Sequence, residues 1–303
     1  MSSAEMNVRG PIPELNRSDK KLKSDKPLLY TQRFFVYLFL ILLSLLCIRP
    51  FWILLVNSTR SSVDIKTSFS MWFGKSFAAN WKGLRGNDKI PTRTALINSI
   101  WISFVSAILT VYFSALTAYS LQVYNFKGKK FISSFILAIR RIPNQVAAMG
   151  LVIFCRKLGL YNQIWLIIIP TICTPSVYFY RKQYLESVLP YEIVEAARVD
   201  GSSELRTFHQ IVLPILRPAI SVQFIFSFVA SWNNYFRPAM LLKNESVRTI
   251  PIVIANLKNS DPSIFDLGQI YLLMAIAVFP MLIIYLIFSR GIIKNLTAGS
   301  VKG

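Results

Sequence analysis

The chain has 303 residues, of which 53% are hydrophobic and only 16% are charged, and its formal net charge is +20. A soluble domain of this length would contain more charged residues and shorter apolar stretches, so the composition favours a membrane protein. The positive charge is scattered over loops and flanks, without a basic and aromatic groove, which argues against nucleic acid as a partner. The lipid bilayer, with anionic headgroups at its inner face, is the expected surrounding.

Six apolar stretches are long enough to cross a bilayer as helices, which takes roughly 20 apolar residues each. They cover residues 34–56, 95–123, 131–154, 164–184, 219–242 and 267–288. Continuous runs of this kind are typical of helices and not of a transmembrane barrel. The sequence therefore predicts an all-α membrane protein with six transmembrane helices in one domain, residues 34–303. Residues 1–33 are polar and basic, and we expect them to form a flexible cytoplasmic tail.

The orientation follows from the short loop after the second stretch, which contains Lys127, Lys129 and Lys130. Short basic loops remain on the cytoplasmic side of a membrane, whereas long loops carry little weight. We therefore expect both termini in the cytoplasm, together with the segment between the fourth and fifth stretches.

Enzymatic functions find little support in the sequence. Gly74, Lys75 and Ser76 match the end of a phosphate-binding loop, but Phe69 stands where that loop needs its first glycine. His209 is the only histidine, which excludes a metal site with several histidine ligands. The sequence thus predicts neither an enzyme, nor a metal site, nor a cofactor bound by this chain.

The six apolar stretches contain no Asp or Glu. A carrier driven by protons usually places a carboxylate inside the membrane, where it binds and releases the proton. The absence argues against an ion-coupled secondary carrier. The energy for any transport is therefore expected to come from a partner.

Residues 186–218 are a polar interruption between the fourth and fifth stretches, and they hold five of the fourteen acidic residues. Helix-forming residues run from 191 to 199, Gly201 interrupts them, and a second helical run reaches residue 211. A helix–glycine–helix element at a membrane surface predicts a docking site for a soluble partner. From composition alone, an ordinary amphipathic surface helix is the simpler alternative.

The spacing of residues within this interruption is specific: Glu195, Ala196, Ala197, Asp200, Gly201, Ile211, Leu213 and Pro214. These residues match the EAA loop of ABC importer permeases, and the segment resembles the carbohydrate branch, related to the smaller maltose channel subunit. The turn at residues 159–162, Trp232-Asn233 with Pro238, and the ending at residues 296–303 resemble further motifs of that family. The similarity covers about residues 33–303.

The resemblance implies a permease subunit of an ATP-driven, binding-protein-dependent importer of sugars or oligosaccharides, in a bacterial cell membrane. Its expected partners are a cytoplasmic ATPase dimer that binds ATP and magnesium, a second homologous permease and an extracytoplasmic sugar-binding protein. A permease for a non-sugar solute is the nearest alternative. Transport would proceed by alternating access.

The residue types in this loop suit the coupling role that the resemblance implies. Ala196 and Ala197 allow close backbone approach, and Glu195 offers a charge to a basic ATPase residue. Gly201 suits a positive φ at a helix end. Ser202 is the expected cap of the next helix, and Pro214 suits a helix start.

The candidate substrate pathway consists of two arginines, four amides and one aromatic residue within the predicted spans: Arg140, Arg141, Asn144, Gln145, Trp232, Asn233 and Asn234. The arginines would bind an anionic or heavily hydroxylated sugar through bidentate hydrogen bonds. Alternatively, they reach towards the interface or pair with an acid on the second permease. The amides suit sugar hydroxyls, although hydrogen bonds between helices explain them equally well.

The polar loop over residues 243–266 resembles the family loop that reaches into the binding protein. The residues expected to make that contact are Asn244, Glu245, Asn259, Ser260 and Asp261.

Overall fold

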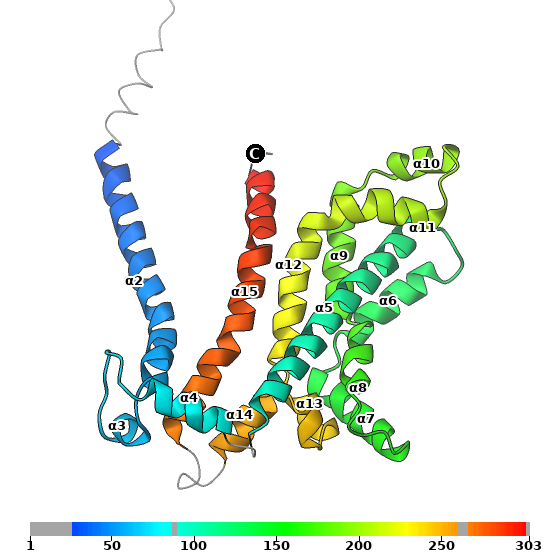
Figure 1. Cartoon of the computed structure of the whole chain (residues 1–303). Helices are drawn as coiled ribbons and strands as arrows, with labels where there is room; N and C mark the ends of the chain where they lie inside the picture. Colours follow the sequence, from blue (N-terminus) through cyan, green and yellow to red (C-terminus); the bar gives the residue numbers. More distant parts are fainter. Residues whose placement is uncertain (1–25, 87–89, 260–265, 301–303) are drawn as a thin grey trace, which may run out of the picture. The chain divides into compact units, whose positions relative to one another are not determined.

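The computed structural model describes residues 26–86, 90–259 and 266–300. Within these ranges the chain is helical and contains no strand (Figure 1). It divides into two compact units, Met1–Ile53 and Leu54–Gly303. The prediction of an all-α protein is therefore confirmed for the described residues.

The first unit consists, where it is described, of most of helix α2 (Lys26–Ser58). The helix contains Pro50, and its part from Gln32 to Ser58 is long and apolar enough to cross a membrane. Residues 26–33, expected in the tail, belong to this helix, and residues 1–25 lie outside the described residues.

In the second unit, α5 (Thr92–Val123) packs against both α9 (Pro175–Val188) and α12 (Leu213–Trp232), and α12 packs against α15 (Leu267–Ser300). The buried side of α5 is rich in small residues: Ala95, Ser99, Ser103, Ser106, Ala107, Thr110, Ser114, Ala115 and Ala118. Small side chains let helix backbones approach closely, which is how helices associate where water supplies no driving force. The sequence of α5 thus makes it the central helix of this unit.

The third predicted span is not one straight helix. Its residues form α6 (Lys129–Ile139) and α7 (Asn144–Lys157), which are bent by 98° at the break between them. Pro143 lies in the break and has no N–H to continue a helix, and it disfavours helical geometry at the residue before it. The expectation of a continuous helix over residues 131–154 is therefore wrong.

The fourth and fifth predicted spans are also interrupted. Residues 164–184 form α8 (Trp165–Ile168), a 3₁₀ turn η1 (Ile169–Thr171) and α9, with prolines at the two junctions. In residues 219–242, α12 ends at Trp232 and is followed by α13 (Phe236–Leu241). Among the described residues, four helices are long and apolar enough to cross a membrane, or five if the bent pair counts as one span.

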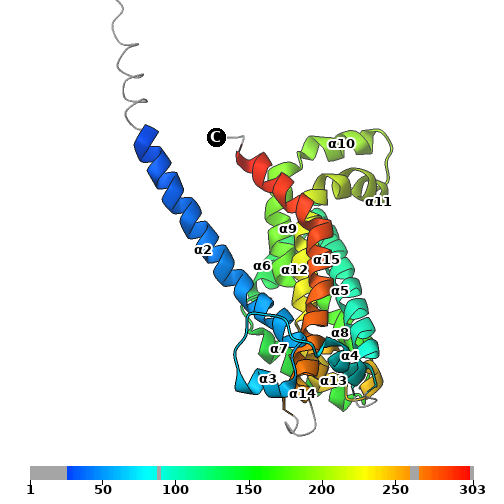
Figure 2. The same cartoon turned by 60° about the vertical axis from the view of Figure 1, so that its left-hand side comes forward.

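The short helices gather at the two ends of the long ones (Figures 1 and 2). At one end of α5, α9 and α12 lie α10 (Tyr191–Val199) and α11 (Glu204–Thr207), and the last turns of α15 point the same way. Several other short helices lie at the opposite end: α3 (Ser62–Thr67), α4 (Phe77–Gly86), α13, η3 (Glu245–Val247) and α14 (Ile250–Lys258).

Candidate functional site

The polar interruption folds as two short helices joined by a left-handed turn at Gly201. The backbone of Gly201 has φ = 76°, a conformation that glycine adopts without steric cost. The N–H of Ser202 returns to the carbonyl of Ala197 at 2.9 Å and closes the end of α10. The expected helix–glycine–helix element is thus confirmed. The expected cap is wrong by one residue, because Ser203 occupies the N-cap position of α11 and Ser202 instead accepts a hydrogen bond from Thr207 at 3.0 Å.

Helix α10 has a buried side and an exposed side. Val194 and Ala197 are buried, and Val194 belongs to the apolar cluster that also contains Phe208, Val212 and Leu216. On the other side, the predicted coupling residues are exposed: Glu195, Ala196, Asp200 and Gly201. The remaining predicted coupling residues, Ile211, Leu213 and Pro214, are half-buried where the segment meets α12.

Two apolar side chains flank the turn at Gly201 and face solvent in this chain. Val199 is 88% exposed and Leu205 is 63% exposed. Apolar side chains that project from the tip of a polar loop are typical of a surface that another protein covers.

An ion pair joins the two short helices across the turn. Arg198 Nε donates to Glu204 Oε1 at 2.8 Å, and Tyr119 Oη of α5 donates to Glu204 Oε2 at 3.3 Å. The hydrogen bond to Glu204 raises the pKa of the Arg198 guanidinium above its usual range. The guanidinium also lies over the ring of Tyr124, 5.5 Å from its centroid. Sequence reasoning did not single out these residues, although opposite charges on either side of a helix-breaking glycine are a readable signal.

The second short helix continues into α12 through a π-helical turn, η2 (Phe208–Val212). His209 lies in this turn, with Nδ1 2.7 Å from the carbonyl oxygen of Leu205 and Nε2 3.1 Å from Tyr112 Oη of α5. Pro214 lies in the first turn of α12, within a continuous helical stretch from Glu204 to Trp232. The expectation that Pro214 suits a helix start agrees with its place in the first turn of α12, although the π-helical turn joins α12 to α11 without a break.

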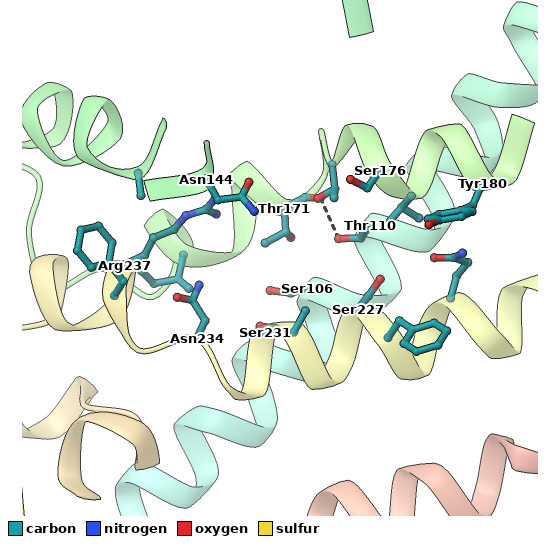
Figure 3. A pocket seen from close by; sticks show the side chains of 18 of the residues that line it. Ser106, Thr110, Asn144, Thr171, Ser176, Tyr180, Ser227, Ser231, Asn234 and Arg237 are labelled. Atoms are coloured by element: carbon teal, nitrogen blue, oxygen red, sulfur yellow. Dashed lines mark hydrogen bonds between the residues drawn. The ribbon is translucent and has the colours of Figure 1, made fainter. Parts of the chain in front are cut away.

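A cavity of about 880 Å³ lies in the second unit, between α5, α7, α9, α12 and α13. Figure 3 shows polar side chains converging on it from several of these helices. Its lining comprises eight hydroxyl side chains, four amides, one cation and seven apolar residues. The polar members are Ser106, Thr110, Thr171, Thr174, Ser176, Tyr180, Ser227, Ser231, Asn144, Gln145, Gln223, Asn234 and Arg237.

Many of these polar groups have no partner within the described chain. The side chains of the four amides make no hydrogen bond there, and the hydroxyls of Ser106 and Ser227 are buried without one. By contrast, Thr110 donates to the carbonyl oxygen of Thr171 at 2.9 Å, the dashed line in Figure 3. Polar groups left unpaired around a cavity are available to a ligand with hydroxyl groups.

The predicted pathway residues fall into two groups. Asn144, Gln145 and Asn234 line the cavity. The other four predicted residues, Arg140, Arg141, Trp232 and Asn233, are absent from its lining.

The two predicted arginines lie in the exposed break between α6 and α7, where Arg140 stacks over the ring of Phe179 at 4.6 Å. Trp232 is only 3% exposed and stacks on Phe228 in the core. Its surroundings are those of a packing residue.

Sequence reasoning missed most of the lining. The missed Ser227 and Ser231 follow the amide of Gln223 at intervals of four residues along α12, and Ser106 and Thr110 are likewise four residues apart on α5. This spacing places them on one side of each helix. A polar stripe on an otherwise apolar helix was the available signal. The cation Arg237 was missed as well.

Asn162 holds the start of the predicted binding-protein loop, residues 243–266, through hydrogen bonds. Its backbone has an unusual positive φ of 57°. Its side-chain oxygen accepts hydrogen bonds from the backbone N–H groups of Lys243 and Asn244, at 2.6 and 2.8 Å. Glu245 pairs with Arg248 at 3.0 Å. Asn259 follows α14 directly, whereas Ser260 and Asp261 lie outside the described residues.

A helical membrane protein with a polar cavity between its helices and a docking loop at one end has the features of a transport subunit. The chain belongs to the family of inner membrane components of binding-protein-dependent transport systems, whose pattern matches residues 110–297. That match includes the two short helices and every element that lines the cavity except the first part of α5.

Curated relatives in this family are named as sugar transport permeases. An arabinooligosaccharides transport system permease protein of Halalkalibacterium halodurans is 35% identical, over 68% of this chain and 73% of the relative. Its counterpart from Bacillus subtilis is 29% identical over 88% of this chain and 94% of the relative. A solved bacterial ABC transporter involved in the import of the acidic polysaccharide alginate shares the fold, with a TM-score of 0.71, 18% identity, and coverage of 92% of this chain and 99% of that one.

Proposed function

We propose that this chain is a membrane-spanning permease subunit of an ATP-driven, binding-protein-dependent importer of sugars or oligosaccharides in the bacterial cell membrane. The observation that carries the proposal is the cavity lined by hydroxyl and amide side chains, combined with membership of the transport family. A sugar presents hydroxyl groups to such side chains and its C–H faces to the apolar part of the lining. The sugar names of the curated relatives agree with this chemistry.

In this proposal the chain crosses the membrane six times. The broken pair α6–α7 would be the third span, and α8, η1 and α9 together the fourth. Both termini would lie in the cytoplasm, which agrees with α15 ending on the same side as the α10–α11 loop (Figure 1). Interrupted helices are tolerated at membrane depth where they line a cavity, as these do.

The α10–α11 loop would dock into the cytoplasmic ATPase dimer, which binds ATP and magnesium. The exposed Glu195 and Ala196 would face the ATPase, while Val194 packs in the apolar cluster that contains Leu216 of α12. A displacement of α10 would then move α12, which carries Gln223 and Ser227 of the cavity wall. Alternating access requires such a link between nucleotide state and cavity shape.

Two further partners belong to the proposal. A second, homologous permease would complete the translocation pathway. An extracytoplasmic sugar-binding protein would contact the loop that contains Asn244, Glu245 and Asn259, at the end of the unit opposite to α10 (Figure 2).

The test is transport by liposomes that contain the chain with its partner permease and ATPase, enclosed ATP, and the binding protein outside. We expect accumulation of oligosaccharides that depends on ATP and persists when ionophores collapse ion gradients. Uptake that requires an ion gradient instead would indicate a secondary carrier. Competition by peptides or phosphate but not by oligosaccharides would indicate a permease for a non-sugar solute.

The docking role is tested separately with Glu195→Lys, which reverses an exposed charge on α10. We expect this variant to lose ATPase binding and transport while the protein still inserts into the membrane. The matched control is Glu186→Lys, which reverses a charge on α9 outside the loop. Full transport by Glu195→Lys would refute the docking assignment.

A further inference from the structure

The cavity contains one charged side chain, Arg237 of α13, and no acidic one. Within the described part of the chain, Arg237 makes neither a hydrogen bond nor an ion pair, and it is partly buried. By comparison, Arg60, Arg198 and Arg248 each donate to side-chain or backbone oxygens, whereas Arg237 shares the lack of a partner with the buried Arg181, which does not line this cavity. An arginine that is partly withdrawn from water and left unpaired beside unpaired amides is suited to an anion that enters the cavity.

The geometry points to a carboxylate on the transported sugar, and we propose that Arg237 selects acidic oligosaccharides that contain uronic acid residues. This inference rests on the proposed sugar-import function and names the substrate class of the same cavity. The planar guanidinium donates two parallel hydrogen bonds to a carboxylate, which fixes both position and orientation. Neutral amides and hydroxyls alone would accept neutral sugars equally well.

The neighbours of Arg237 complete a subsite for such a sugar ring. In Figure 3 its side chain extends towards Asn144 of α7, and Asn234 of the α12–α13 turn lies beside it. Both amides are free to donate to the sugar. A carboxylate held by Arg237 would thus have ring hydroxyls within reach of an amide from α7 and an amide from the α12–α13 turn.

The position of Arg237 also suits an entry role. Helix α13 lies at the end of the unit opposite to the α10–α11 loop, which is the outer end in the proposed orientation (Figures 1 and 2). A cation without a neighbouring acid, in a cavity with low-dielectric walls, raises the local concentration of anions. The nearest alternative is that an acid of the second permease neutralises Arg237 across their interface.

The experiment uses the complete importer in ATP-loaded liposomes with its binding protein. The probes are mixed di- to tetrasaccharides from pectin and alginate hydrolysis, and the same mixture after chemical reduction of its carboxyl groups. Mass spectrometry of the extracted vesicles measures which probes accumulate. We expect the acidic probes to accumulate, and Arg237→Gln to raise the concentration needed for half-maximal uptake by about 10- to 100-fold, as for a lost charged hydrogen bond.

Two variants make the result specific. Arg237→Lys keeps the charge without the bidentate geometry, so it should recover part of the loss. Arg156→Gln removes an exposed cation outside the cavity and should leave uptake of both probe sets unchanged.

The outcomes separate this inference from the function on which it rests. Accumulation of only the carboxyl-reduced probes would overturn the inference and leave sugar import intact. Equal losses for both probe sets in Arg237→Gln, or failure of that variant to purify with the second permease, would assign Arg237 to the subunit interface and also overturn it. If neither probe set accumulates although the complex hydrolyses ATP, the proposed function itself fails.

Discussion

Replacing Gly201 by alanine gives a direct test of the turn that presents α10. A left-handed conformation costs a residue with a Cβ atom about 1–2 kcal/mol. The Cβ atom itself would meet open space, since no heavy atom lies within 4 Å of its position. The whole effect of Gly201→Ala is therefore backbone strain, equivalent to a factor of about 5–30 in an equilibrium constant.

The strain would either lower the thermal stability of the complex or change the orientation of α10, and both effects can be measured. If the turn keeps its shape, the purified complex should unfold at a lower temperature. If the turn relaxes, α10 is presented in another orientation, and more ATPase subunit is needed for half-maximal ATP hydrolysis. Gly201→Asn should show a smaller effect in either measurement, because asparagine tolerates this region of the backbone map.

The matched control is Gly150→Ala in α7, where the added Cβ also meets open space but φ is helical. There the substitution should be neutral or slightly stabilising, because glycine inside a helix costs roughly 0.5–1 kcal/mol relative to alanine. If Gly201→Ala behaved like Gly150→Ala in both assays, the turn would not need its left-handed residue and the reasoning would be refuted.

Three further predictions concern side chains. For the half-exposed pair Arg198 and Glu204, a double-mutant cycle with glutamine at each position should give a coupling energy of only about 0.2–1 kcal/mol in thermal unfolding, as for other surface pairs; a value near zero would mean that the pair does not hold the two short helices together. Arg181 is completely buried and its guanidinium has no hydrogen-bond partner among the described residues, so Arg181→Met should stabilise the detergent-solubilised protein by about 1–3 kcal/mol, and destabilisation would show that another conformation or subunit pairs it. Trp232→Ala should cost about 3–5 kcal/mol of stability through a core cavity, whereas Asn234→Ala should lower sugar affinity with little loss of stability; a reversal of the two effects would contradict the placement of these side chains.

The sequence predicts the structure of the α10–α11 loop better than that of the membrane-spanning stretches. The loop was predictable because Gly201 and its flanking helix formers act locally: one residue with a positive φ determines where α10 ends. The spans were predicted too simply. Pro143 is visible in the sequence, yet whether a proline kinks a helix slightly or accompanies a bend of 98° depends on what packs against both halves.

The residues that line the cavity were also predicted only in part. Asn144, Gln145 and Asn234 were found because amides are conspicuous in apolar stretches. Serine and threonine are not, since their hydroxyls commonly bond to their own helix, as Thr171 does with Ile168 at 2.6 Å. Arg237 was missed because its importance comes from lacking a partner, which only the tertiary structure shows.

Helix α12 connects the two sites, and its construction explains how one can act on the other. Near its start, Leu216 is buried in the same apolar cluster as Val194 of α10, and its first cavity residues, Val222 and Gln223, follow about 10 Å further along at 1.5 Å per residue. Between α11 and α12 lies the π-helical turn η2, a local irregularity of a kind that is frequent at functional sites. In the proposed function, a movement of α10 would reach Leu216 through Val194 and their shared apolar cluster, and α12 would carry it to Ser227 and the cavity wall.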